Sequence, residues 1–430
     1  MKTTMLRNLF VLALAAMTLP VCFAAGKAEP SENAQSAQSA LTITFDQFSG
    51  SGDNEMYLRQ MIDLYTKANP NVTIKLQSYG YDDYFRQLTA KVSAGQAADV
   101  FELNYENFVA YAKNGSLLAL DDIIKEENIA ISRYNPKALN AFNTDGKQYG
   151  VPNSFSNVVL IYNKALFDRA DIPYPTNDWK WADVMAAAEK IRALGAGIFG
   201  YYHPLSFNEF YKVAAQNGGS FLNQAGTQFT INTPANLETL SYLVNMQRQS
   251  NVMPTPEQMG GMGDWDLFKS GRLGMIITGI WAFPDFTRDC DFDWDIVVEP
   301  GNKQKATHFF SNGYVIKRNS AVSREAAKFI AFISSNPQAT QIRLDAAWEL
   351  PPVTDSAIIA LYKAKTPPAN REAVFSSMDY LVTPPVITQF AQLQDIVSRH
   401  LNEAAAGRVT PEAALANMEA ECLRNIDLSK

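Results

Sequence analysis

The chain has 430 residues, of which 47% are apolar and 19% charged. These are ordinary proportions for a folded protein in water, and a chain of this length has room for about two or three domains, each with its own core. Its 37 Lys and Arg residues stand against 44 Asp and Glu, a formal net charge of −7. This balance argues against a nucleic-acid-binding protein, because neutralising phosphates requires clustered positive charge.

The sequence also gives no support for a metal centre or a disulfide framework. Only three histidines occur, far apart in the sequence, so a histidine-rich metal site is not expected. Three cysteines cannot form a disulfide framework, and we expect Cys290 and Cys422 to be free thiols. We therefore expect neither a metal nor a cofactor.

The N-terminus has the layout of a secretory signal peptide. Basic residues precede an apolar run over residues 9–19, which is about half of the ~20 residues needed to cross a bilayer. Small residues follow, so we expect a signal peptide over residues 1–24. The alternative is lipidation of Cys22 in a lipobox-like segment, in which Val21 is a poor fit directly before the cysteine.

Residues 25–40 are rich in Ala, Ser, Gln and Glu and contain no aromatic or β-branched residue. Such a segment buries too little apolar area to offset its ordering entropy. We therefore expect a flexible tether between the export signal and the folded part of the chain.

The next hundred residues alternate between strand and helix patterns. From residue 55 to residue 68 apolar residues recur at helical spacing, and Asn69-Pro70 ends the run. Strands alternating with helices through short connections are typical of a parallel-sheet α/β lobe. We expect strands over residues 41–45, 72–76 and 99–103, and helices over residues 55–68, 84–93 and 105–114.

The pattern changes at Gly150-Val151-Pro152, which we expect to interrupt the secondary structure before a buried strand over residues 157–162. The last fifty residues are expected to be helical, and Thr410-Pro411 has the N-cap and first-turn residues of a helix start. In between we expect helices over residues 181–194, 208–217, 234–250, 266–270 and 324–333, and strands over residues 274–278, 294–298 and 309–316.

No catalytic motif emerges. Residues 195–200 (GAGIFG) match the dinucleotide-binding pattern, but a helix precedes them and a loop follows, whereas the motif needs a strand before it and a helix after it. Residues 291–295 alternate acidic and apolar residues, as a half-exposed strand would. We expect a protein that is not an enzyme; the rival is a secreted carbohydrate-active enzyme using Asp264 or Asp285.

Four blocks of sequence, in this order, resemble the extracellular solute-binding proteins of bacterial ABC transporters, specifically the sugar-binding type that includes maltose-binding protein. They are residues 98–101 (ADVF) with 111–117 (YAKNGSL), residues 146–152 (GKQYGVP) with 160–167 (LIYNKALF), residues 268–275 (FKSGRLGM) with 279–282 (GIWA), and residues 405–415 (AAGRVTPEAAL). The blocks cover nearly the whole exported chain.

The resemblance implies the type II periplasmic-binding-protein fold, in which two α/β lobes are joined by a hinge and the ligand lies in the cleft between them. It implies a monomer that binds a carbohydrate, closes its lobes and delivers the ligand to a membrane permease, at the periplasmic or extracellular face of the bacterial membrane. We expect residues 41–157 and 309–365 in the N-terminal lobe, and residues 158–308 and 366–430 in the C-terminal lobe.

Sugars present apolar faces and hydroxyl edges, so their sites pair aromatic platforms with planar polar side chains. The resemblance places Trp281 where the family has a stacking Trp. The other residues we expect at the ligand are Gln47, Ser49, Glu102, Asn104, Ser154, Asn157, Tyr202, His203, Trp265, Asn312, Gly313 and Trp348.

Two departures from the family favour a short ligand, a mono- or short oligosaccharide. The Trp that many relatives carry in the loop after the first strand is absent from residues 46–49, and Leu103 stands where maltodextrin binders tend to have an aromatic residue. A polyol, a phosphorylated polyol and a polyamine remain alternatives. A polyamine would need several carboxylates in the cleft, and a phosphorylated ligand an Arg or Lys close to Trp281.

Overall fold

The computed structural model describes residues 40–50, 54–248 and 250–429. The expected signal peptide, the lipidation of Cys22 and nearly all of the expected tether lie outside the described residues. Within them, no helix has the length and apolar character that a membrane crossing requires.

A nine-stranded mixed sheet runs through the molecule in the order β2-β1-β3-β10-β6-β8-β7, with β9 also paired to β6 and β11 to β10. A separate hairpin consists of β4 (Asn143–Thr144) and β5 (Lys147–Gln148). The strands of the main sheet are β1 (Leu41–Gln47), β2 (Val72–Ser78), β3 (Val100–Asn104), β6 (Gly150–Asn163), β7 (Phe199–Tyr202), β8 (Leu273–Gly279), β9 (Trp294–Val298), β10 (Thr307–Ile316) and β11 (Leu381–Val382).

The first strands and helices confirm the predicted α/β alternation. Strand β1 pairs in parallel with β2 and β3, and the connecting helices are α1 (Asn54–Ala68) and α2 (Tyr81–Ser93). Helix α1 forms because Leu58, Met61, Ile62 and Tyr65 recur every three or four residues, and all four are buried.

Strand β6 corrects the prediction that Gly150-Val151-Pro152 interrupts the chain. Its fourteen residues are all buried and include this tripeptide. Pro152 is tolerated because the pairing with β10 shifts register there: Ser154 faces Asn312 and Pro152 faces Gly313, so Asn153 is an extra residue. Such a bulge accommodates a residue that cannot donate a ladder hydrogen bond.

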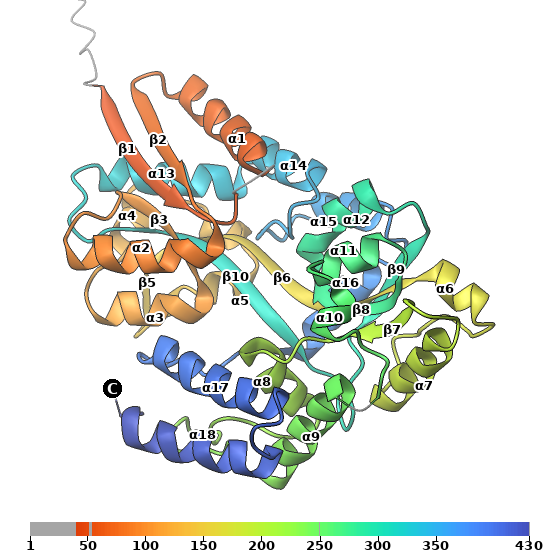
Figure 1. Cartoon of the computed structure of the whole chain (residues 1–430). Coiled ribbons are helices and arrows are strands. Elements are labelled where there is room, and N and C mark those ends of the chain that lie inside the picture. The colour runs from red at the N-terminus through yellow and green to blue at the C-terminus, as the bar shows by residue number, and fades with distance from the viewer. Residues whose placement is uncertain (1–39, 51–53, 249, 430) are drawn as a thin grey trace, which may run out of the picture. The chain divides into compact units, whose positions relative to one another are not determined.

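Strands β6 and β10 are the two long strands that connect the ends of the sheet (Figure 1). The first half of β6 pairs with β10, and its second half pairs with β8 and β9. Strand β10 in turn pairs with β3 through its last five residues. The sheet around β1–β3 and the sheet around β7–β9 are therefore joined through these two strands.

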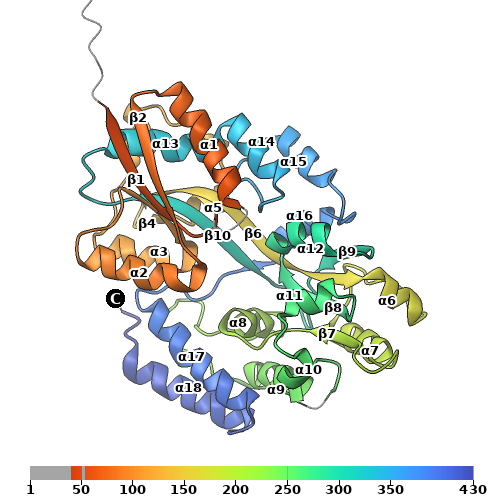
Figure 2. The same cartoon turned by 45° about the horizontal axis from the view of Figure 1, so that its top comes forward.

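The two faces of the sheet belong to different apolar clusters. We call the face that carries His308, Phe310, Asn312 and Tyr314 of β10 the inner face. Near β8 the inner face packs against α7 (Trp181–Arg192), α8 (Phe207–Gln216), α9 (Pro234–Arg248), α17 (Phe390–Ala405) and α18 (Pro411–Asn425). Near β1 it packs against α1, α13 (Ser323–Ser335) and α14 (Pro337–Asp345) (Figure 2).

The opposite, outer face carries Phe155, Val159 and Phe309 in a third cluster. The remaining helices are α3 (Tyr105–Lys113), α4 (Asp121–Glu126), α5 (Pro136–Asn140), α6 (Lys164–Arg169), α10 (Pro256–Met259), α11 (Asp264–Lys269), α12 (Phe283–Asp289), α15 (Ser356–Lys363), α16 (Glu372–Ser376) and the short 3-10 helices η1 (Ile131–Arg133), η2 (Ile280–Ala282) and η3 (Ser377–Tyr380).

Two further predictions can be compared with the structure. The half-exposed strand over residues 291–295 is wrong: β9 begins at Trp294 and all five of its residues are buried. The burial of the Asp295 carboxylate is offset in part by a hydrogen bond of 2.8 Å that it accepts from the backbone N–H of Asn370. Cys290 and Cys422 are free, as expected.

Candidate ligand-binding site

Three of the expected site residues meet on neighbouring strands. Asn312 of β10 faces Asn104 of β3 on one side and Ser154 of β6 on the other. Directly opposed residues of antiparallel strands project from the same face, so these side chains share the inner face. The next opposed pair on that face is Phe310 and Ser156. We call these five residues the inner-face stripe.

The stripe lies at the boundary between the helices that pack near β1 and those that pack near β8. On β10, Tyr314 belongs to the cluster under α1 and α13, whereas Phe310 packs on the edge of the cluster under α7, α8 and α9. Buried amides and hydroxyls in a row are costly unless they find partners. A row of them between two apolar layers is therefore a natural place for a polar ligand.

Trp281 adds an aromatic ring beside the stripe. It lies on η2, directly after β8, and its half-buried indole meets Phe310 edge to face with ring centroids 5.0 Å apart. The ring folds back over Gly279, where a Cβ atom would lie only 2.0 Å from it. The absence of a side chain at Gly279 thus leaves room for the indole in this orientation.

Trp265 lies apart from Trp281. Its indole N–H donates a 3.2 Å hydrogen bond to Oγ1 of Thr278, and its ring packs with Phe286 in the outer-face cluster. The structure therefore places Trp265 and Trp281, two of the three expected tryptophans, on different faces of the sheet.

The polar groups of the loop after β1 hydrogen bond to neighbouring parts of the protein. The Glu102 carboxylate accepts hydrogen bonds from the backbone N–H groups of Phe48 and Ser49 at 3.0 and 2.9 Å, and from the Asn153 amide at 2.7 Å. The Gln47 amide accepts from the Gly50 N–H and donates to Ser78. These side chains hold the loop in shape.

Asn157 and Gly313 lie outside the stripe. Asn157 faces Phe309 on the outer face, and its side-chain amide donates a 2.7 Å hydrogen bond to the carbonyl of Val374. A Cβ atom at Gly313 would lie 2.6 Å from the ring of Phe142, so this glycine permits close packing.

His203 belongs to a buried ion network rather than to the stripe. Its Nε2 lies 2.5 Å from the Glu209 carboxylate, and the Lys212 ammonium lies 2.6 Å from Glu209 and 2.7 Å from Glu299. His203, Glu209 and Glu299 are close enough to hold a metal ion. The lysine ammonium already bridges both carboxylates, however, so the donor set does not fit a metal.

Tyr202 is half-buried and lines a surface hollow of about 450 Å³ together with Met253, Pro254 and Met259. Burial, with a smaller contribution from Asp264, raises the pKa of its hydroxyl. This hollow lies beside α9 and α10 and includes no residue of the stripe.

Trp348 is only 3% exposed. The Arg343 guanidinium lies 4.0 Å above its ring, and a Cβ atom at Gly50 would lie 2.9 Å from the ring edge. The indole is thus enclosed between Arg343 and the loop after β1, which it helps to support.

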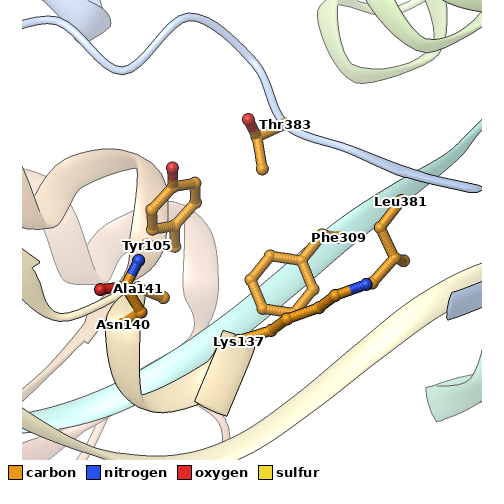
Figure 3. Close-up of a pocket in the computed structure, with 7 residues that line it drawn as sticks. All are labelled: Tyr105, Lys137, Asn140, Ala141, Phe309, Leu381 and Thr383. Carbon is orange, nitrogen blue, oxygen red and sulfur yellow. The ribbon is translucent and has the colours of Figure 1, made fainter. Parts of the chain in front are cut away.

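A second hollow opens on the outer side of β10 (Figure 3). Tyr105, Lys137, Phe309 and Leu381 are among its lining residues, and its volume is about 240 Å³. This is below the ~300–1,000 Å³ of typical small-molecule sites. It lies on the opposite face from the stripe.

Sequence reasoning missed Ser156 and Phe310. Each lies two residues from an expected site residue on the same strand, Ser154 and Asn312. Phe310 lies within the predicted strand over residues 309–316, so the two-residue period of a strand would have assigned it to the same face as Asn312. Ser156 lies just before the predicted strand over residues 157–162, and the sequence did not reveal that β6 already begins at Gly150.

The family model of bacterial extracellular solute-binding proteins matches residues 51–340, and the chain belongs to this family. An ABC substrate-binding protein of Listeria monocytogenes, solved in complex with cycloalternan, is 44% identical, superposes with a TM-score of 0.85, and covers 90% of this chain and 98% of its own. A putative binding protein of Brucella abortus is 24% identical over 85% of this chain and 88% of its own. The arabinooligosaccharide-binding protein of Bacillus subtilis is 22% identical over 77% of this chain and 78% of its own.

The family and the fold together test the predictions about fold, activity and location. Maltose-bound MalE3 of T. maritima, at 18% identity, superposes with a TM-score of 0.76, and the type II fold with two α/β lobes joined by a hinge is confirmed. The family consists of solute-binding proteins, so the chain is a binding protein and the rival enzyme is set aside. It works outside the cytoplasm, as the family description states.

Proposed function

We propose that the protein captures an oligosaccharide outside the bacterial cell and delivers it to the membrane permease of an ABC importer. The observation that carries this proposal is the 44% identity, over nearly the whole described chain, to a protein that was solved with cycloalternan. The sequence analysis favoured a mono- or short oligosaccharide.

The chemistry of the stripe supports a neutral, hydroxyl-rich ligand. Its polar side chains are the amides of Asn104 and Asn312 and the hydroxyls of Ser154 and Ser156. Amides and hydroxyls both donate and accept, as sugar hydroxyls do. Trp281 and Phe310 supply aromatic surface for the apolar faces of a sugar ring.

The same chemistry disfavours the alternative ligands. A phosphorylated polyol would call for a cation, and the five stripe residues include no Lys or Arg. A polyamine would call for several available carboxylates, whereas the five stripe residues include none and Glu102 is engaged by its own loop. The described stripe is uncharged.

Closure follows from the way β6 and β10 join the two ends of the sheet. We place the lobe boundaries at residues 157/158, 308/309 and 365/366, so that both strands cross between the lobes beside the stripe, whose five residues then belong to the N-terminal lobe while Trp281 belongs to the C-terminal lobe. A ligand that contacts groups of both lobes binds the closed form more tightly and so shifts the population toward it. Closure then gives the permease a distinct surface to recognise.

The N-terminus has two possible fates: lipidation of Cys22, which would anchor the chain to the membrane, or cleavage after residue 24, which would remove Cys22 with the signal peptide. Mass spectrometry of the protein isolated from its native host distinguishes these outcomes, because a lipidated chain begins at Cys22 with added acyl mass and a cleaved chain begins at residue 25.

A thermal-shift screen of the purified exported chain tests the ligand class. The panel contains cycloalternan, maltose, maltotriose, arabinooligosaccharides, polyols, glycerol phosphate and polyamines. A ligand that binds only the folded state raises the melting temperature by mass action. We expect the oligosaccharides to raise it. A shift with a polyamine or glycerol phosphate and with no saccharide would contradict the proposal.

A further inference from the structure

The segment after α14 adds one more row to the inner face. Leu350 and Phe155 exchange both backbone hydrogen bonds, each at 3.2 Å, in an antiparallel bridge at the edge of β6. Both side chains belong to the outer-face cluster. The neighbouring residue Glu349 is therefore opposite Ser156, on the inner face.

This register aligns four residues across the sheet. Glu349 faces Ser156, Ser156 faces Phe310, and Phe310 contacts Trp281. Adjacent strands are about 4.8 Å apart, so the backbone of Glu349 lies roughly 10 Å from that of Phe310. A carboxyl group thus lies at one end of the row and an indole at the other, with a hydroxyl between them.

The backbone of this segment is strained on both sides of Trp348. Ala347 has φ of 52° and Glu349 has φ of 55°, values in the left-handed region that non-glycine residues seldom adopt. Such conformations persist where the surrounding structure enforces them, and they cluster at functional sites. Here the enclosed Trp348 ring and the bridge at Leu350 hold Glu349 between them.

The Glu349 carboxyl differs from that of Glu102 in its partners. Glu349 is 7% exposed, and its Oε2 has no hydrogen-bond partner among the described residues. The hydroxyls of Ser154 and Ser156 and the Arg343 guanidinium partly offset its burial, which nevertheless raises the pKa of the carboxyl. A buried polar atom without a partner lowers the stability of the fold, so its presence calls for a use.

We infer that Glu349, and not Trp348, is the ligand-contacting residue of this segment: its carboxyl hydrogen bonds to a hydroxyl of the oligosaccharide, and Trp348 with Arg343 supports it from behind. This inference rests on the proposed function and adds a specificity-determining residue to it. Glu349 would select ligands that place a hydroxyl at the end of the row away from Trp281.

Calorimetric titration with cycloalternan and maltotriose, and thermal melting without ligand, test the assignment in four proteins: wild type, Glu349→Ala, Glu349→Gln and the neighbouring control Trp348→Phe. We expect Glu349→Ala to weaken binding by about 10- to 100-fold, the usual effect of losing a hydrogen bond to an ionisable group. Glu349→Gln keeps the shape and should bind with intermediate affinity.

The control should behave in the opposite way. Trp348→Phe should melt at a lower temperature and, once folded, bind within about twofold of wild type, because the ring fills space and does not touch the ligand. Unchanged affinity in Glu349→Ala, or in Glu349→Gln should the alanine variant not fold, overturns the inference. If the wild type binds no saccharide at all, the proposed function fails first; normal wild-type binding with unaffected Glu349 variants refutes only this assignment.

Discussion

The indole of Trp281 meets the ring of Phe310 edge to face, with centroids 5.0 Å apart and planes 85° apart. Phe310 lies on β10, one of the two strands that join the ends of the sheet, and Trp281 directly follows β8. An edge-to-face contact limits how the indole can turn. It holds the Trp281 ring beside Phe310, a member of the inner-face stripe.

The first prediction concerns the Trp281 ring. Trp281→Ala should weaken oligosaccharide binding by about 10- to 100-fold, since stacking and its desolvation contribute roughly 1–3 kcal/mol. Trp265→Ala is the matched control, because Trp265 lies on the outer-face side, and it should leave affinity nearly unchanged. Calorimetric titration and melting of both variants decide the matter. A Trp281→Ala protein that melts lower and yet binds normally would show that the residue is core.

The second prediction concerns Gly279, whose missing side chain makes room for the indole. Gly279→Ala would place a Cβ atom 2.0 Å from the Trp281 ring, so the ring must rotate away. We expect weaker binding and a shift in Trp fluorescence, since overpacking forces side chains out of their preferred rotamers. Gly80→Ala, where a Cβ meets no atom within 4 Å, is the control. Equal affinity in the two variants would contradict this role.

The third prediction concerns the anchor of the loop after β1. In Glu102→Gln one carboxylate oxygen becomes an amide donor that faces backbone N–H groups or the Asn153 amide. Leaving buried donors without acceptors costs about 1–3 kcal/mol each. We expect a lower free energy of unfolding in urea, with weaker binding because the loop loosens. Unchanged stability would show that Glu102 is not the anchor.

The fourth prediction concerns pH. His308 is buried between Glu106, 3.1 Å from its Nε2, and the Tyr211 hydroxyl. Burial lowers the pKa of His308, and the carboxylate of Glu106 offsets part of this. Because the folded-state pKa lies below the unfolded value of about 6.5, this contribution to stability is complete above that pH and is lost as the pH falls.

Urea unfolding at pH 7.5 and pH 5.5 measures this effect in the wild type and in His308→Gln. The wild type should lose more free energy of unfolding than the variant between the two pH values, because the glutamine cannot titrate. An equal loss in both proteins would place the pH dependence elsewhere.

Local sequence predicted much of the fold. Helix α1 and the parallel strands around it follow from periodicity, because a parallel βαβ unit is built from neighbouring segments. The start of β6 could not be predicted, since Pro152 judged from its neighbours alone indicates the end of a strand. Only pairing with β10, more than 150 residues away, creates the bulge that accommodates it.

The candidate site divides in the same way. Asn104, Ser154 and Asn312 were expected at the ligand and do meet on one face. In the sequence, Glu102 and Gln47 were equally good candidates for ligand contacts, but in the structure their polar groups hydrogen bond to the loop after β1. The position of Glu349 depends on the bridge between Leu350 and Phe155, which no local sequence pattern predicts. A polar residue at the end of a strand does not reveal whether its partner is a ligand or its own backbone.

The most direct test of the account is a calorimetric titration of the wild-type exported chain with cycloalternan, repeated with Trp281→Ala. We predict saturable one-to-one binding by the wild type, no breakdown of the saccharide afterwards, and a large loss of affinity in the variant. Failure of the wild type to bind cycloalternan or any other saccharide of the panel, or equal affinity in both proteins, would contradict the claim that the inner-face stripe and Trp281 form an oligosaccharide site.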